Sequence, residues 1–207
     1  NKHRDVITAA CLATLLPMSS ALSIHPGKIK WTLHPDHEQL RAYLETGEWQ
    51  AQCKEIKTTD RRTVYYVKQN PGLNVDPAEN ECSKPALFVK HDHPPGLRDK
   101  IKSLWRCKSK VEYSIGDQLG LAHVNAAPVV AWGRQGQHSW LVTLAIEQVK
   151  PLDEVWRTHK ENSASRSRFM QGLQQLFGQM QNAGVLHRDL HARNVLVNSI
   201  EDSNDTD

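Results

Sequence analysis

Hydrophobic and other strand-favouring residues gather in several short runs that polar or turn residues separate, the pattern of β-strands. Two of these runs flank the polar residues 58–62 and predict a hairpin, and two more flank residues 134–139 and predict a second. Pro94-Pro95-Gly96 ends the run between the hairpins, because proline cannot continue a strand ladder. The predicted strands cover residues 52–57, 63–68, 86–90, 129–133, 140–146 and 195–197.

Two other stretches show apolar residues at the period of about 3.6 residues that is typical of helices. Val111, Ile115 and Leu119 recur every four residues, and we expect Gly120 to cap this helix at its C-terminus. Residues 165–182 predict a second, longer helix that ends before Gly184. Its apolar face consists of Phe169, Leu173, Leu176, Phe177 and Met180.

The predicted order is strands, one helix, strands and then helices, which describes an α+β protein with two lobes. We divide the chain into an N-terminal leader or extension over residues 1–47, a strand-rich lobe over residues 48–147 and the start of a helical lobe over residues 148–207. A chain of 207 residues that is 39% hydrophobic suits a folded globular protein and excludes disorder throughout.

The segment from Lys84 to Lys110 is basic. It contains eight basic residues but only two acidic ones, both aspartates, and it includes Trp105. Such a segment suits an anionic membrane surface or a phosphorylated glycan as well as nucleic acid. For the protein as a whole we expect no nucleic acid as partner. An ordinary solvated helix face is the alternative.

The apolar run Val6 to Leu16 is too short to span a bilayer, and we expect a helix or an unstructured leader there rather than a signal peptide.

The four cysteines lie 42, 29 and 25 residues apart without a C-x-x-C pair. This spacing argues against a zinc site or a disulfide framework and favours a reducing compartment. The His91-Asp92-His93 triplet has no further ligand cluster near it in the sequence, so we interpret it as an ordinary loop rather than a metal site.

Residues 187–194 read His-Arg-Asp-Leu-His-Ala-Arg-Asn and lead into Val195-Leu196-Val197. They fit the phosphoryl-transfer loop H-R-D-x-x-x-x-N, in which the Asp accepts the proton of the acceptor hydroxyl and the Asn holds magnesium. Asp189 is therefore the predicted base, with Arg188 beside it as a further catalytic candidate, and Asn194 is the predicted metal ligand. A strand start that carries polar residues by chance is the alternative.

A kinase also needs a strand lysine at the phosphates of ATP and a helical glutamate that pairs with it. Lys90 and Glu112 fit these two roles, and we expect them to form the ion pair. No glycine-rich loop precedes Lys90, so phosphate cover must come from other backbone amides or from Arg61 and Arg62. A D-F-G segment is absent as well. We interpret the chain as a fragment that stops before it, and expect the fragment alone to be inactive.

These motifs resemble the lipopolysaccharide core kinases, protein-kinase-like enzymes that phosphorylate heptose or Kdo sugars. Besides the loop, the resemblance rests on Phe88-Val89-Lys90, Pro94 to Leu97, the basic helix with Glu112, and residues 119–133. It implies a bilobal fold with an antiparallel N-lobe sheet, one helix and the first part of a helical C-lobe. It also implies ATP and Mg²⁺ as cofactors and a lipid-linked glycan as acceptor. The implied location is cytoplasmic and peripheral at the inner membrane.

By the same resemblance Lys90 binds ATP phosphates, Glu112 pairs with it, Asp189 is the base and Asn194 holds magnesium. His191 favours a sugar kinase, because serine/threonine protein kinases usually carry Lys two residues after the catalytic Asp, whereas kinases of sugars often carry His. With Ala in place of His191 the loop would match the tyrosine-kinase form, so a tyrosine protein kinase is the first alternative. The missing glycine loop leaves a pseudokinase scaffold as the second.

Overall fold

The computed structural model describes residues 7–9, 29–68, 86–146, 148–185 and 191–198. These residues belong to two compact units. The first, called the sheet unit below, draws on residues 13–117 and 128–145. The second, called the helical unit, draws on residues 1–12, 118–127 and 146–207. Each unit is described by itself.

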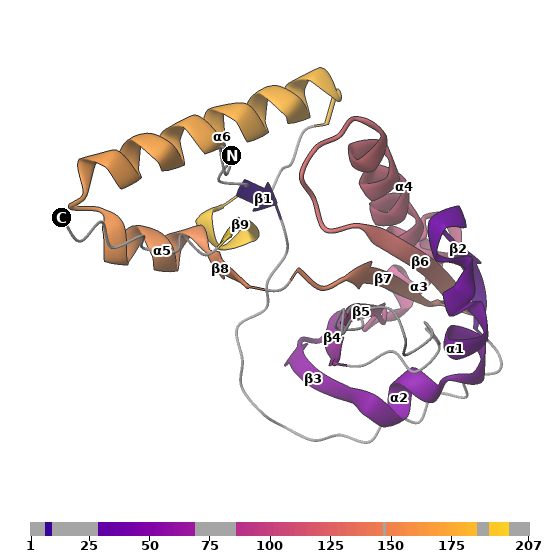
Figure 1. Ribbon diagram of the computed structural model, residues 1–207. Coiled ribbons are helices and arrows are strands. Elements are labelled where there is room, and N and C mark those ends of the chain that lie inside the picture. Colours follow the sequence, from indigo (N-terminus) through magenta and orange to yellow (C-terminus); the bar gives the residue numbers. More distant parts are fainter. Residues whose placement is uncertain (1–6, 10–28, 69–85, 147, 186–190, 199–207) are drawn as a thin grey trace, which may run out of the picture. The chain divides into compact units, whose positions relative to one another are not determined.

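The sheet unit is built on six antiparallel strands in the order β2-β6-β7-β5-β4-β3 (Figure 1). Their bounds are β2 (Lys30–Leu33), β3 (Cys53–Thr58), β4 (Arg62–Val67), β5 (Leu87–Asp92), β6 (Val129–Gln135) and β7 (His138–Leu144). Both predicted hairpins are confirmed, β3-β4 and β6-β7. The predicted α+β class with an antiparallel sheet is confirmed with them.

The core of the sheet unit includes residues that precede position 48. Strand β2 pairs with β6, and it leads into the 3₁₀-helix η2 (Pro35–Leu40) and the helices α1 (Arg41–Thr46) and α2 (Glu48–Gln52). Trp31, Tyr43 and Leu44 are buried in the same cluster as Val89 of β5. The stretch that we assigned to a leader up to residue 47 therefore supplies an edge strand and core side chains. Its apolar alternation covers too few residues to stand out in the sequence.

Two helices lie between β5 and β6 in sequence, α3 (Leu97–Trp105) and α4 (Lys108–Leu121). The helix that we predicted from Val111 is α4, but Gly120 does not cap it. The helix continues to Leu121, and His123 takes the left-handed conformation at φ 53°. Its N–H donates to the Gly120 carbonyl at 3.0 Å, and the Val124 N–H donates to the Leu119 carbonyl at 2.9 Å. This is the pair of bonds that ends a helix in a Schellman motif.

The helical unit combines the strands β1 (Ile7–Ala9), β9 (Val195–Asn198) and β8 (Val149–Pro151) with the helices α5 (Leu152–His159) and α6 (Ser163–Asn182). Helix α6 confirms most of the predicted apolar face, since Phe169, Leu176 and Met180 are buried together and Leu173 packs against them. The prediction is wrong for Phe177, which is 48% exposed. The Asn162 side chain caps its first turn, and Gly184 follows its last turn at φ 66°. Of the helices in the described ranges, none is long and apolar enough to cross a membrane.

Candidate active site

The predicted loop is described only over its second half. Arg188 and Asp189 lie outside the described residues, so their catalytic roles stay predictions. Asn194 ends the short helix η3 (Ala192–Asn194), is 4% exposed and directly precedes strand β9. Its N–H donates to the His191 carbonyl at 2.8 Å, while Nδ1 of His191 accepts from the Arg193 N–H at 3.3 Å. Asn194, the predicted magnesium ligand, is therefore buried in this turn.

A side-chain ion pair fixes this turn to α5. Nε of Arg193 lies 3.1 Å from Oδ2 of Asp153, and the same oxygen lies 3.1 Å from Nη2 of Arg157. Asp153 therefore links the first turn of α5 to η3 within the helical unit. The contact places the described end of the loop against a helix that is itself packed into the unit's core.

Lys90 lies on the face of β5 that points away from the main core. Leu87 and Val89 are buried in that core, while Phe88, Lys90 and Asp92 alternate with them and are half-buried. Lys90 is opposite Val64 of β4 and Leu141 of β7 in the sheet register. In the part of the chain that the structure describes, its amine has neither an ion-pair nor a hydrogen-bond partner. An amine in this position can bind an anion without first breaking a contact.

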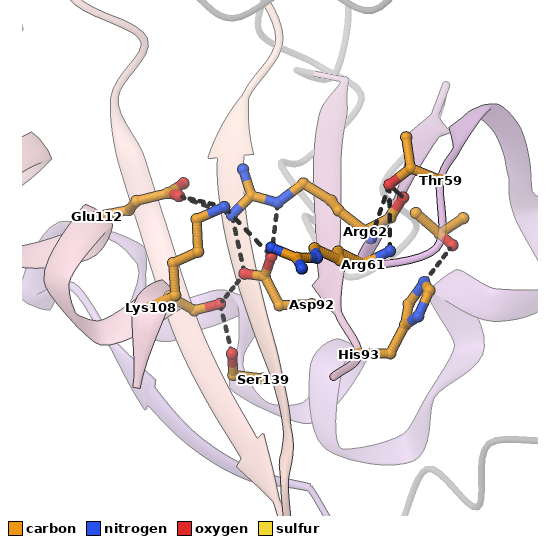
Figure 2. A network of polar contacts seen from close by, with 10 residues as sticks. Thr59, Arg61, Arg62, Asp92, His93, Lys108, Glu112 and Ser139 are labelled. Atoms are coloured by element: carbon orange, nitrogen blue, oxygen red, sulfur yellow. Dashed lines mark hydrogen bonds and ion pairs between the residues drawn. The ribbon is translucent and has the colours of Figure 1, made fainter. Parts of the chain in front are cut away.

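The expected ion pair between Lys90 and Glu112 is not formed. Glu112 instead accepts a hydrogen bond from Nη2 of Arg62 at 2.6 Å, and Nζ of Lys108 lies 3.8 Å away from the same oxygen. Figure 2 shows Arg62 reaching from β4 to both Asp92 and Glu112. The partner of Glu112 is therefore Arg62, a cation that lies 50 positions earlier in the chain.

Arg62 also forms a two-point ion pair with Asp92, at 2.7 Å and 2.8 Å. Burial lowers the pKa of Arg62, but the hydrogen bond to Asp92 and the negative charges of Glu112 and Asp92 outweigh it, so the pKa lies above its ordinary value. Arg62 is therefore occupied inside the sheet unit and is not available to cover phosphates, as we had considered from the sequence. Arg61 is 69% exposed and pairs with Asp99 at 3.5 Å.

Helix α4 meets the sheet through small residues rather than through its apolar stripe. Oγ of the buried Ser109 lies 3.0 Å from Oδ2 of Asp92 and 2.9 Å from Oγ of Ser139. One turn beyond Glu112, Gly116 packs so closely against Val129 that a Cβ there would overlap it. Ile115 is 40% exposed. Our expectation that the stripe at Val111, Ile115 and Leu119 marks the buried face is therefore wrong for this part of the helix.

A pocket of about 500 Å³ opens beside this network in the sheet unit. Its polar lining includes Asp92 and Glu112 as well as Arg61, Arg106 and Lys108. Asp92 and His93 line it, where Asp92 holds Arg62 and Nε2 of His93 lies 3.1 Å from the Thr63 hydroxyl. The expectation that His91-Asp92-His93 is a loop is wrong for its first two residues, because His91 and Asp92 belong to β5 and His91 is buried. Within the described ranges no three His, Cys, Asp or Glu side chains gather as a metal site would require.

A search of curated proteins finds no match to this chain. A comparison with protein families does find one. The matched residues run from 101 to 206, which is more than half of the chain and takes in Glu112, the whole predicted loop and Asn194. Lys90 and Arg62 lie outside the matched residues. The chain belongs to the lipopolysaccharide kinase (Kdo/WaaP) family.

Proposed function

We propose that this protein is an ATP-dependent kinase that phosphorylates a sugar hydroxyl of a lipopolysaccharide core or a similar lipid-linked glycan. The observation that supports it most is the family match over residues 101–206, which contains every fixed position of the H-R-D-x-x-x-x-N loop. In the described part of that loop, Asn194 is 4% exposed and directly precedes β9.

The residues suit ATP and magnesium in their chemistry. Lys90 offers a cation with no competing partner among the described residues, which fits a phosphate ligand. The amide oxygen of Asn194 is a hard ligand of the kind that magnesium prefers. Bound MgATP supplies the phosphoryl group and neutralises part of the charge that develops on it. In the proposal Lys90 is a ligand of the phosphates and Asn194 is a ligand of the magnesium ion.

Asp189 performs the acid–base part of the proposed reaction. Its carboxylate accepts the proton of the acceptor hydroxyl as the hydroxyl oxygen forms a bond to the γ-phosphorus. The bond between that phosphorus and the bridging oxygen breaks, and its electron pair leaves with ADP. Arg188 stands next to this carboxylate in the chain and is its proposed electrostatic support. The sugar acceptor is favoured over a tyrosine by His191, two residues beyond the base.

The proposed place of the reaction is the cytoplasmic face of the inner membrane, where ATP and a lipid-linked acceptor meet. The spacing of the cysteines supports a reducing compartment. Cys53 and Cys107, the two that lie in described ranges, are both free thiols. The basic segment from Lys84 to Lys110 supports a peripheral contact with the anionic lipids of that face.

Phosphoryl transfer from labelled ATP tests the proposal. The complete product of the gene is incubated with lipopolysaccharide core and, separately, with a pool of tyrosine peptides. We expect label in the glycan, and we expect Asp189→Asn to lower the turnover number by a factor of about 10² to 10⁴, the usual contribution of a general base. The matched control is Asp60→Asn, which removes an exposed carboxylate at the β3-β4 turn and should leave turnover unchanged.

Two results would overturn the proposal. Label in the peptides alone would identify a protein kinase. Nucleotide binding without transfer to either acceptor, equal in the parent and in Asp189→Asn, would identify a pseudokinase scaffold.

A further inference from the structure

Three apolar side chains of helix α3 lie on the outside of the sheet unit. Leu97, Ile101 and Trp105 are 76%, 53% and 88% exposed. They recur every four residues, so they form one stripe along the nine-residue helix. Such a stripe normally turns toward a core. Here it remains uncovered by any described residue of the unit.

The opposite face of α3 is polar and is the one held by the protein. Asp99 and Ser103 of this face line the pocket of about 500 Å³ beside the Arg62 network. Arg61 pairs with Asp99 at 3.5 Å, and Nη2 of Arg134 donates to the Ser103 carbonyl at 3.3 Å. These contacts fix the rotation of the helix about its axis. Its apolar stripe therefore points outward as a consequence of the fold.

The charges around the stripe select the partner. Arg98, Lys100, Arg106 and Lys108 are all exposed on or beside α3. The one carboxylate within the helix, Asp99, is paired with Arg61, so Arg98 and Lys100 have no free carboxylate on the same helix. Lys108 differs from them, because its amine lies 3.8 Å from both Asp92 and Glu112. Two copies of this surface would repel each other, whereas an anionic bilayer attracts it. Trp105, the most exposed of the three apolar side chains, has the amphipathic ring that favours the membrane–water interface.

We propose that α3 is a membrane-contact helix that lies in the interface of an anionic bilayer. Leu97, Ile101 and Trp105 enter the boundary of the acyl chains, while Arg98 and Lys100 contact lipid phosphates. This deepens the membrane location proposed above by naming the element that makes the contact. It rests on surface chemistry and not on phosphoryl transfer, so vesicle binding and kinase activity fail independently. The chain needs no membrane-spanning segment for such a contact.

Flotation of the 207-residue chain with lipid vesicles tests the helix. One set of vesicles is pure phosphatidylcholine, and the other is an equimolar mixture with phosphatidylglycerol. We expect binding to the anionic set only, weakened by salt because exposed charges are screened. The double variant Ile101→Ser/Trp105→Ser should bind the anionic vesicles at least tenfold more weakly. Both side chains are exposed, so the fold should persist, and circular dichroism checks that it does.

Helix α6 provides the matched control. Met170 and Phe177 are 52% and 48% exposed, and Met170→Ser/Phe177→Ser removes exposed apolar side chains that do not belong to the α3 stripe. That variant should bind as the parent does. Arg98→Gln/Lys100→Gln should lose the preference for phosphatidylglycerol, whereas Lys54→Gln/Lys57→Gln on the exposed face of β3 should keep it.

Three results would overturn the proposal. The first is equal binding of both sets of vesicles, or of neither. The second is equal loss of binding in the α3 and α6 variants. The third is a parent chain that self-associates through α3 in sedimentation experiments and binds no vesicles, because the occupant of the stripe would then be a second copy.

Discussion

Arg62 and Asp92 face each other across β4 and β5 and join through both oxygens of the carboxylate. The same guanidinium holds Glu112 of α4, so one side chain ties the helix to two strands (Figure 2). The side chains of Arg62 and Asp92 are 20% and 13% exposed. At that degree of burial a missing partner leaves a charge that water solvates only in part.

Removal of this cation should destabilise the sheet unit. We expect Arg62→Met to lower the free energy of unfolding by about 2–3 kcal/mol, because Asp92 and Glu112 would remain as close carboxylates without their main partner. Urea denaturation measures the change. Lys108→Met is the matched control, since its amine is 3.8 Å from both carboxylates but its side chain is 62% exposed. Its effect should stay below about 0.5 kcal/mol, and equal losses in the two variants would contradict the assignment.

His91 should make the stability depend on pH. Its ring stacks on Trp140 at 4.6 Å, and its Nε2 lies 2.9 Å from Nδ1 of His138. Burial first, then His138 and His93, lowers the pKa of His91 to about 3 from an ordinary value of 6.5. Between these two values the unfolded chain binds a proton that the folded chain does not. The free energy of unfolding therefore falls as the pH falls through this range, by up to about 1.4 kcal/mol per pH unit.

His91→Phe tests this origin, because it keeps an aromatic ring on Trp140 and removes the titrating group. The comparison is the difference in unfolding free energy between parent and variant, measured at neutral pH and again near pH 5. That difference should shift by about 2 kcal/mol in favour of the variant as the pH is lowered. Parallel curves over this range would show that His91 is not the source.

Two glycines of α4 should respond in opposite ways to the same substitution. A Cβ on Gly116 would overlap Cγ1 of Val129, so we expect Gly116→Ala to cost about 1–3 kcal/mol of stability despite the better helix propensity of alanine. A Cβ on Gly120 meets no atom within 4 Å, so Gly120→Ala should gain about 0.5–1 kcal/mol. Thermal unfolding of the two variants separates them. A gain at both positions would mean that α4 does not approach β6 as closely as described.

The hairpins could be predicted because runs of strand-favouring residues flank short polar stretches, and α6 because its apolar period repeats over several turns. The sequence did not reveal β2, whose alternation covers only Lys30–Leu33. The partner of Glu112 was also missed, since Arg62 and Lys90 are both cations on strands and only the register brings Arg62 opposite Asp92. The sheet-facing side of α4 was misread for a related reason. Ser109 and Gly116 allow close approach by being small, and a hydrophobic pattern does not detect small residues.

Substitution of Lys90 should change mainly the affinity for MgATP, whereas substitution of Glu112 should change mainly the free energy of unfolding. Lys90 has no partner among the described residues, so we expect Lys90→Met to change the free energy of unfolding by less than about 0.5 kcal/mol. If its amine binds the phosphates, the same variant should bind MgATP at least tenfold more weakly, a loss of about 1.4 kcal/mol. Lys57→Met, on an exposed position of the same sheet, controls for the lost charge.

Glu112→Gln should show the reverse balance. Its hydrogen bond from Arg62 would become a weaker bond to a neutral oxygen, so we expect stability to fall by about 1–2 kcal/mol. Affinity for MgATP should fall by less than in Lys90→Met, because in this structure Glu112 holds Arg62 and not Lys90. Calorimetric titration and urea denaturation of the same preparations give both quantities. If Glu112→Gln weakened MgATP binding as strongly as Lys90→Met, nucleotide would have to draw Glu112 from Arg62 to Lys90.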